Sequence, residues 1–461
     1  YAIAVDRQDP YHIYGGTQDN GVWEGPSNYK AGVEWQSSGA YPYEELLGGD
    51  GMQVEVDWRT NDIVYAGYQF GNYFRIHKKE GSRKSISPKH ELGQRPFRFN
   101  WQTPILLSRH NQDILYLGSH MLHRSMNQGN DWVAISGDLT QGGKIGDVAY
   151  GTLTSISESP FQFGLLYTGS DDGRVHVSED SGSEWSDISA GLPSNMWVSR
   201  VVASSYVKDR VYCSLNGYRW DDFEAYLFVS EDKGQSWLSI GDDLPHEPVN
   251  VVKEDPVNQN VLFVGTDHGV YISLDRGSTF MSIGSDLPAV AVHDLVVHPD
   301  ANELVLGTHG RSIYTADVSQ IQQLDDTIMK KSVHLFSLAK VRYRSNWGQE
   351  RLYRDHEYVE SEVSIPVYLK DESKLTIAIE LNDTEISSWE ERGVKGLNFF
   401  TYDLSFDKKF ADTVLAKAVE KDEDFEWPDT DNNKVYLPPG DYTVKISLSS
   451  AVESTVTLKV E

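Results

Sequence analysis

The chain has 461 residues, of which 39% are hydrophobic and 11% are aromatic, so it can bury substantial cores and is not a disordered chain. Its formal net charge is −28 at pH 7, and we expect such a surface to repel nucleic acid, other polyanions and anionic membranes. It has no apolar run of about 18 residues, and we therefore expect no membrane insertion.

Residues 1–5 have the pattern of a strand already in progress. No charged segment followed by an apolar one, as in a signal peptide, comes before this strand. We therefore interpret the chain as part of a longer protein, whose export these residues cannot reveal. The single cysteine, Cys213, lies in an apolar strand pattern, where we expect a small buried side chain rather than a nucleophile.

A repeated unit of three or four short strands occupies the first part of the chain. In most units the second strand ends at a glycine, and these glycines set the register: Gly16, Gly67, Gly118, Gly169, Gly265 and Gly307. The first three intervals are 51 residues each, the interval of 96 has room for two units, and the last is 42. Such periods are typical of propeller blades. The sequence therefore predicts a seven-bladed β-propeller over residues 1–324.

A second motif, S-x-D-x-G-x-x-W, which we call the Asp box, follows the third strand of several units. It is complete in residues 178–185 and 230–237, ends in Phe in residues 273–280, and has Asn in place of Asp in residues 125–132. The acidic or amide side chain is expected to accept hydrogen bonds within its turn, and the aromatic residue to pack between sheets. We therefore predict a structural role, not a catalytic one, for four residues: Asn127, Asp180, Asp232 and Asp275.

After the repeats the pattern changes. Residues 325–360 are charged and irregular, and we predict a linker whose apolar stretch, residues 333–338, packs on the propeller. Strand alternation returns from residue 361 to residue 461, with about seven short strands, which predicts an Ig-like β-sandwich. The predicted fold class is therefore all-β, with a seven-bladed Asp-box propeller followed by an Ig-like sandwich.

The chain resembles the C-terminal half of bacterial two-propeller Asp-box proteins, described as sortilin-like or as BNR-repeat glycosyl hydrolases. Besides the Asp boxes, the resemblance rests on six segments along nearly the whole chain: residues 16–21, 98–105, 197–200, 248–252, 292–295 and 307–313. It implies a secreted, periplasmic or cell-surface protein, and a second propeller N-terminal to this one as a partner. The family has no settled activity to carry over.

Propellers bind ligands at one mouth of the central channel, where the starts of first strands and the loops between strands converge. Aromatic residues beside carboxylates and arginines at these positions suit a glycan or peptide ligand, although each can also be a turn or inter-blade hydrogen-bonding residue. The predicted ligand-binding residues are Asp50, Arg98, Asn100, Trp101, Tyr150, Trp197, Arg200, Tyr218, Arg219, His293, Asp294, His309 and Arg311.

Catalysis is predicted only through Asp19. The first propeller unit also resembles that of xyloglucanase-like enzymes, in which an Asp follows a second strand, and this resemblance implies that Asp19 is the general acid of an inverting hydrolase. Its partner carboxylate, about 6.5–9.5 Å away, would lie on the missing propeller. The surrounding Thr17-Gln18-Asp19-Asn20-Gly21 departs from the enzyme motif.

Other enzyme classes find less support. Phe74-Arg75-Ile76-His77 resembles the Phe-Arg-Ile-Pro motif of sialidases, but it falls on a third strand and no arginine triad accompanies it. No spacing of metal ligands is present, and we expect no metal and no cofactor. The sequence thus favours a propeller that binds or hydrolyses glycans at its channel mouth. The alternative is a non-catalytic sortilin-like propeller or assembly scaffold that binds peptides or proteins.

Overall fold

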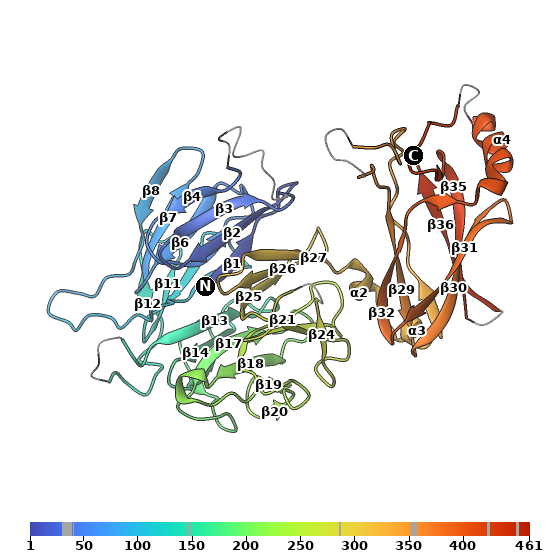
Figure 1. Ribbon diagram of the computed structural model, residues 1–461. Coiled ribbons are helices and arrows are strands. Elements are labelled where there is room, and N and C mark those ends of the chain that lie inside the picture. The colour runs from blue at the N-terminus through green and yellow to red at the C-terminus, as the bar shows by residue number, and fades with distance from the viewer. Residues whose placement is uncertain are drawn as a thin grey trace. The chain divides into compact units, whose positions relative to one another are not determined.

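A computed structural model describes residues 1–29, 39, 41–144, 146, 149–284, 287–351, 357–421, 425–448 and 451–461. The chain divides into two compact units, Tyr1–Gln322 and Gln323–Glu461 (Figure 1). Strands make up 43% of the chain and helices 6%, which confirms the predicted all-β class. None of the helices within these described ranges is long and apolar enough to cross a membrane.

The described part of the first unit contains seven antiparallel sheets, which we number in chain order. Sheets one to four comprise β1 (Ala2–Val5), β2 (His12–Thr17), β3 (Gly21–Pro26) and β4 (Glu44–Leu47); β5 (Gly51–Val56), β6 (Ile63–Tyr68), β7 (Asn72–His77) and β8 (Ser82–Ser85); β9 (Ile105–Leu107), β10 (Leu115–Gly118), β11 (Leu122–Ser125) and β12 (Val133–Ala134); and β13 (Leu153–Glu158), β14 (Leu166–Ser170), β15 (Val175–Ser178) and β16 (Ser186–Asp187).

The remaining sheets follow the same order of neighbouring strands, except that the seventh has three strands. Sheets five to seven comprise β17 (Trp197–Ala203), β18 (Val211–Asn216), β19 (Tyr226–Ser230) and β20 (Leu238–Ser239); β21 (Val249–Glu254), β22 (Leu262–Thr266), β23 (Val270–Ser273) and β24 (Met281–Ile283); and β25 (Val292–Val297), β26 (Glu303–Thr308) and β27 (Ile313–Asp317). A short 3-10 helix, Tyr218–Trp220, lies between β18 and β19.

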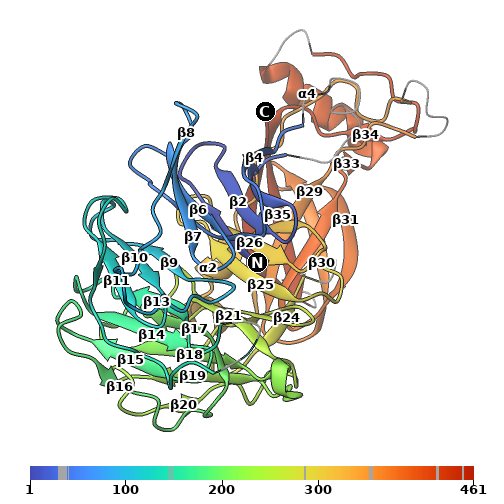
Figure 2. The same ribbon diagram turned by 90° about the vertical axis from the view of Figure 1, so that its left-hand side faces the viewer.

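The first strands of the seven sheets form a closed ring. Each contacts the first strand of the next sheet, and β25 contacts β1, so the seventh sheet meets the first. Figure 2 shows the sheets following one another around a common centre, from the blue β2 to the yellow β26. Apolar side chains fill the space between consecutive sheets; Val198 and Cys213, for example, share a core with Tyr167 and are fully buried. Because neighbouring sheets cover both faces of a sheet, middle strands such as β14 and β18 are buried along their whole length.

The Asp-box turns join sheets three to six each to the sheet before it. In sheet four, Asp180 accepts hydrogen bonds from the Glu184 N–H and the Ser178 hydroxyl, both at 2.9 Å. The box glycine, Gly182, has a φ of 92° and packs against Ile135 of sheet three. The indole of Trp185 donates to the carbonyl of the same Ile135 at 2.9 Å. The motif therefore shapes a turn and couples two sheets, with its carboxylate satisfied by its own turn.

The other boxes repeat these contacts. Asp232 accepts from the Ser236 N–H at 2.9 Å, Asp275 from the Thr279 N–H at 2.8 Å, and Asn127 from the Asp131 N–H at 2.9 Å. Hydrogen bonds from the turn lower the pKa of the Asp180 and Asp232 carboxyls below the usual range. Such carboxylates are acceptors in a closed turn rather than groups poised to transfer protons.

The second unit has one main core, enclosed by two larger sheets and a two-stranded pair. One sheet has the order β28 (Val333–Leu335), β29 (Val363–Leu369), β32 (Gly396–Tyr402), and the other the order β31 (Thr384–Gly393), β30 (Ser373–Leu381), β35 (Gly440–Leu448), β36 (Ala451–Val460). The two-stranded pair is β33 (Ser405–Phe406) with β34 (Val435–Tyr436). Helix α2 (Ser319–Gln323) lies in the chain where the first unit ends and the second begins. The described helices of the second unit are α3 (Asp326–Met329), a 3-10 helix at Lys408–Phe410, and α4 (Ala411–Lys421).

The structure differs from the predicted linker at residues 325–360. Val333–Leu335 forms β28, which pairs antiparallel with β29, and both Val333 and Leu335 lie in the core of the second unit. The Leu335 N–H also donates to the Ser454 hydroxyl at 3.0 Å. This apolar stretch is therefore not a segment packed on the propeller, because its alternating side chains complete a sheet of the second unit. Residues 352–356 of the predicted linker lie outside the described residues.

Candidate functional site

One end of the first unit is formed by two kinds of segment, the turns between second and third strands and the residues just before first strands. We call this end the mouth face. Hydrogen bonds connect the two kinds of segment from sheet to sheet: the Phe70 N–H donates to the Trp101 carbonyl at 3.3 Å, and the Leu153 N–H to the Ser119 carbonyl at 2.7 Å. Most of the predicted site residues lie on this face, because the strands of every sheet alternate in direction.

Asp19 lies in the turn between β2 and β3, with a φ of 61° and an exposed side chain. Its N–H donates to a carboxylate oxygen of the buried Asp50 at 2.8 Å, so Asp50 fixes this turn to the start of sheet two. The two predicted residues are therefore neighbours, joined through a backbone donor. In this pair the Asp50 carboxylate stabilises the turn, whereas the Asp19 carboxylate faces water.

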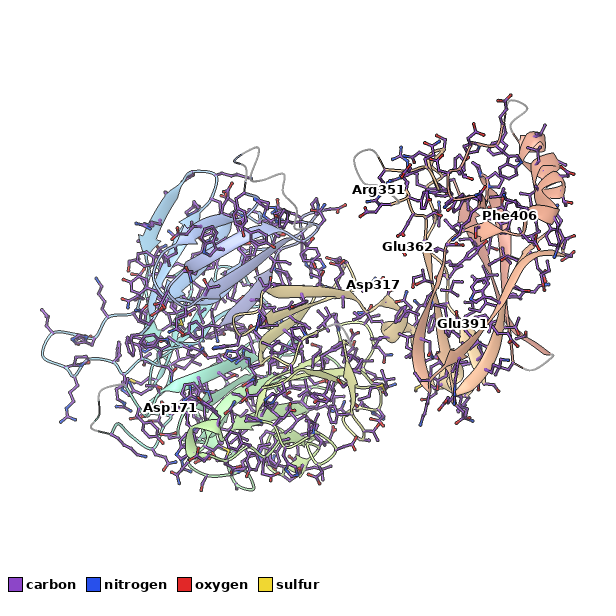
Figure 3. The ribbon with its side chains drawn as sticks, in the orientation of Figure 1. Asp171, Asp317, Arg351, Glu362, Glu391 and Phe406 are labelled. Atoms are coloured by element: carbon purple, nitrogen blue, oxygen red, sulfur yellow. The ribbon has the colours of Figure 1, made fainter. Side chains whose placement is uncertain are left out.

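Arg98 and Asn100 connect sheet three to sheet four. The Arg98 guanidinium pairs with Asp138 at 2.7 Å and donates to the Gly151 carbonyl at 3.1 Å. The amide of Asn100 is buried and donates to the Thr152 hydroxyl at 2.8 Å. Asp171, labelled in Figure 3, lies between β14 and β15 and accepts hydrogen bonds from the N–H groups of residues 151 and 152. Both predicted residues are thus occupied in holding the mouth face together.

Aromatic side chains on the mouth face remain accessible. The Trp101 ring packs edge-on against Phe70, with centroids 5.2 Å apart, and the Lys144 ammonium lies 4.1 Å from the centre of the Tyr150 ring. The Arg219 guanidinium stacks on Trp197 at 4.0 Å, a cation–π contact. Four aromatic residues of the turns are at least one third exposed: Phe70 (36%), Tyr218 (57%), Trp220 (45%) and Phe223 (49%).

A chain of charged residues lines the central channel beneath this face. Arg200 of β17 reaches across to Asp294 of β25, with N and O atoms 3.2 Å apart, and the other Asp294 oxygen accepts from the Ile3 N–H at 3.1 Å. A channel cavity of about 200 Å³ is also lined by Glu55 and Lys253, which project from the first strands of sheets two and six. The predicted pair Arg200 and Asp294 therefore links sheets five, seven and one.

Burial governs the protonation of the channel groups. It raises the pKa of Glu55 to about 7, although the nearby Lys253 ammonium acts in the opposite direction. It also lowers the pKa of Lys253, which the carboxylates of Asp294 and Glu55 oppose. His293 packs against His309 with ring centroids 5.0 Å apart, and burial together with neighbouring positive charge lowers the pKa of His293 to about 4. His293 is therefore neutral at pH 7.

The raised pKa of Glu55 predicts a dependence of stability on pH. The folded chain holds this proton more tightly than the unfolded chain, so the free energy of unfolding should fall as pH rises from about 4.5 to about 7. Glu55→Gln keeps a neutral side chain of the same size and should flatten this decline. Urea unfolding of both proteins between pH 4.5 and 8 measures the difference, and parallel curves would contradict the assignment.

A larger cavity, of about 860 Å³, opens between sheets seven and one. One wall is aromatic and comes from β3 and the residues around it; the other is formed by β27 and the turn before it. Asp294 is the one carboxylate among the described residues that line it, and it is already paired with Arg200. The aromatic wall consists of Trp23, Tyr29, Tyr41 and Tyr43.

The predicted site residues do not all meet in one place. Arg200, His293, Asp294 and His309 cluster at the channel, whereas Tyr218 and Arg311 are exposed on separate turns. Glu55, Lys253 and the aromatic cavity wall were not among the residues predicted from the sequence. A signal for the first two was present, since each is a charged residue that directly follows a buried valine of a first strand. Among the described residues no cluster has the composition of a metal site.

Known proteins share this fold. Residues 225–362 match the model of the Sortilin-Vps10 family, described as Sortilin, neurotensin receptor 3. The GH74 xyloglucanase of Xanthomonas campestris aligns with 86% of the chain at 15% identity and a TM-score of 0.51. The GH74 enzyme of Niastella koreensis aligns with 80% at 15% identity and a TM-score of 0.50. No curated protein sequence matches the chain significantly.

The chain spans 66% of the length of the first of these enzymes and 57% of the second. At 15% identity the likeness concerns the fold alone. Together with the family match and the small antiparallel sheets, it confirms the resemblance predicted from the repeats. The chain contains a β-propeller similar to those of sortilin-like proteins and xyloglucanases.

Proposed function

We propose that the first unit is a seven-bladed propeller that binds neutral glycans on its mouth face, and that the second is an Ig-like sandwich. Seven sheets whose first strands form a closed ring support the blade number. Two sheets around one core support the sandwich. We also propose an extracytoplasmic location, in which polysaccharides are the available ligands.

The observation that carries the glycan proposal is the set of exposed aromatic rings on the mouth face. Tyr218, Trp220 and Phe223 come from one turn of sheet five, and the stacked pair of Trp197 and Arg219 lies beside them. Exposed apolar groups gathered on functional loops are characteristic of binding sites. Flat rings can bind the apolar faces of sugars, while the charge of −28 disfavours anionic glycans.

The arrangement of carboxylates supports glycan binding rather than hydrolysis carried out by this chain alone. Inverting hydrolysis requires two carboxyl groups about 6.5–9.5 Å apart. Of the three carboxylates predicted for the site, Asp19 faces water, Asp50 accepts from a backbone N–H, and Asp294 accepts from a backbone N–H and from Arg200. The similar GH74 proteins are named as enzymes, and we propose that any hydrolysis here requires a carboxylate from a second propeller. Loss of glycosidase activity in Asp19→Asn, within that larger protein, would place Asp19 in the acid role.

The glycan proposal predicts a loss of affinity when a mouth-face ring is removed. The chain should bind neutral oligosaccharides, xyloglucan fragments included, on an array and in calorimetry. Phe223→Ala should weaken this binding about tenfold, or by about 1.4 kcal/mol, because the few residues that dominate a binding site lose more than about 1 kcal/mol on truncation.

Phe161 provides the matched control. It is the same residue type with nearly the same exposure, 48% against 49% for Phe223. However, it lies between β13 and β14, where a first strand meets a second, at the end of the unit opposite the mouth face. Phe161→Ala should therefore bind glycans like the unaltered chain. Equal losses in both variants, or no neutral glycan bound at all, would refute the proposal.

A further inference from the structure

The strand β32 forms an unprotected edge of the second unit. Over the described residues, the two larger sheets of this unit end in β28 and β32, and in β31 and β36. Proteins protect such edges with charge, bulges, short strands or covering segments, because unpaired backbone groups attract other strands. β32 runs over seven residues without a charged residue, a proline or an irregularity in its pairing with β29. Among the described residues no strand pairs with its outer side.

The other three edges are protected. β28 has only three residues. β31 pairs irregularly with β30 and carries four charged residues: Glu385, Glu390, Arg392 and Glu391, the last of which is labelled in Figure 3. Residues 341–343 cover β36, and the Val341 N–H donates to the Lys459 carbonyl at 2.9 Å. β32 is therefore the exception among the described edges, and its neighbours in the sequence, β31 and β33, pair in other sheets.

The hydrogen bonds of the neighbouring strand show which groups face the open side. The Phe336 N–H donates to the Pro366 carbonyl at 3.1 Å, so Pro366 of β29 directs its backbone away from β32. Pro366 lies opposite Phe399, and bonded and non-bonded pairs alternate along an antiparallel ladder. Every second residue of β32 therefore directs its N–H and C=O groups outward: Leu397, Phe399 and Thr401. The Phe399 side chain is 56% exposed.

This edge is complementary to a copy of itself. When two such strands meet antiparallel about a two-fold axis at Phe399, Leu397 of each comes opposite Thr401 of the other, and all three outward residues can bond. The two Phe399 rings then form a cross-strand aromatic pair, which stabilises antiparallel strands. The same register places Lys395 opposite Asp403 at both ends of the pairing. Since the strand itself is uncharged, no like charges oppose each other within it, although each chain carries −28.

We propose that two copies of the chain associate through β32, antiparallel and in register about Phe399, and join their sheets into one continuous sheet. Strand addition to a free edge uses main-chain hydrogen bonds for affinity. Such an interface is small, and small interfaces form weak, transient complexes, so we expect a dimer in equilibrium with the monomer. This association concerns the second unit and does not rest on the glycan proposal.

Sedimentation equilibrium of the full chain tests the association, and it should show a mixture of monomer and dimer that depends on concentration. Phe399→Lys places two like charges opposite each other at the axis and should weaken the dimer about tenfold or more. Phe161→Lys is the matched control, because it makes the same change of charge at a phenylalanine of similar exposure, 48% against 56%. Phe161 belongs to the first unit, and this variant should dimerise like the unaltered chain.

A second arm tests the register through oxidation of introduced thiols, since the native Cys213 is buried. Phe399→Cys brings two thiols into one bonded pair, whose Cα atoms lie about 5.5 Å apart, and a disulfide-linked dimer should form with oxidised glutathione. Thr401→Cys should form none, because its two copies lie four residues apart along the pairing, or about 14 Å.

Three results would overturn the proposal. The first is a chain that stays monomeric at every concentration, and the second is equal dimerisation of Phe399→Lys and the unaltered chain. The third is equal cross-linking of Thr401→Cys and Phe399→Cys, since the copies would then meet in another register. Phe399→Lys should bind glycans like the unaltered chain, so a failure of the dimer and a failure of the glycan proposal can be told apart.

Discussion

Replacing Asp294 by alanine should lower the free energy of unfolding of the first unit by about 3 kcal/mol, because it leaves the Arg200 guanidinium as an uncompensated charge in the channel. Both side chains are largely buried, with 18% of Arg200 and 11% of Asp294 exposed. The substitution also removes the acceptor of the Ile3 N–H, which connects β25 to β1 where the ring closes. Chemical denaturation of both proteins at pH 7 measures the change.

Asp294→Asn separates charge from hydrogen bonding. The amide oxygen can still accept from the Ile3 N–H, but the attraction between opposite charges is lost. The free energy of unfolding should therefore lie between that of the unaltered chain and that of Asp294→Ala. The double variant Arg200→Met with Asp294→Leu removes both charges and should recover part of the lost stability. If Asp294→Ala unfolds at the same denaturant concentration as the unaltered chain, the pair has no part in holding the ring closed.

The second large effect concerns the box glycine of sheet five. Gly234 has a φ of 88°, and a Cβ there would lie 2.3 Å from the end of Ile188 and 3.0 Å from its Cβ. Gly234→Ala should therefore cost about 1–2 kcal/mol for the left-handed backbone and about 1–3 kcal/mol more for overpacking. Thermal and denaturant unfolding should both show the loss.

Gly191 separates the backbone part of this cost from the packing part. Its φ is 92°, close to that of Gly234, but the nearest atom to a Cβ would be 4.0 Å away. Gly191→Ala should therefore lose only the backbone contribution. The difference between the two variants measures how tightly the Asp-box turn packs on the preceding sheet. Equal losses would show that the turn tolerates a side chain and that the contact with Ile188 is loose.

The strand pattern and the Asp boxes could be predicted because they depend on local chemistry. Alternating apolar residues, turn glycines and acceptors such as Asp180 act within a few residues of the chain. Residues 333–338 were assigned to the wrong neighbour, since an apolar stretch reveals that it is buried but not which core receives it. The helix α4 was missed although Val414 and Ala418 are buried one turn apart, because it lies in a strongly charged stretch.

The candidate site was predictable only in part. Position in the repeat located the mouth-face residues, but it could not distinguish Arg98 and Asn100, which hold sheets together, from the accessible rings of Trp220 and Phe223. That distinction depends on contacts between sheets about 50 residues apart in sequence. The channel position of Glu55 likewise follows from closure of the ring, which no single repeat encodes.

The closure of the ring also bears on the order in which the first unit can fold. Within each sheet the strands that pair are neighbours in the sequence, so a sheet can form from a short stretch of chain. The hydrogen bond from Ile3 to Asp294, in contrast, joins residues 291 positions apart. Bringing such distant segments together costs chain entropy before the contact is made, so we expect the meeting of β25 with β1 to be a late and slow step of folding.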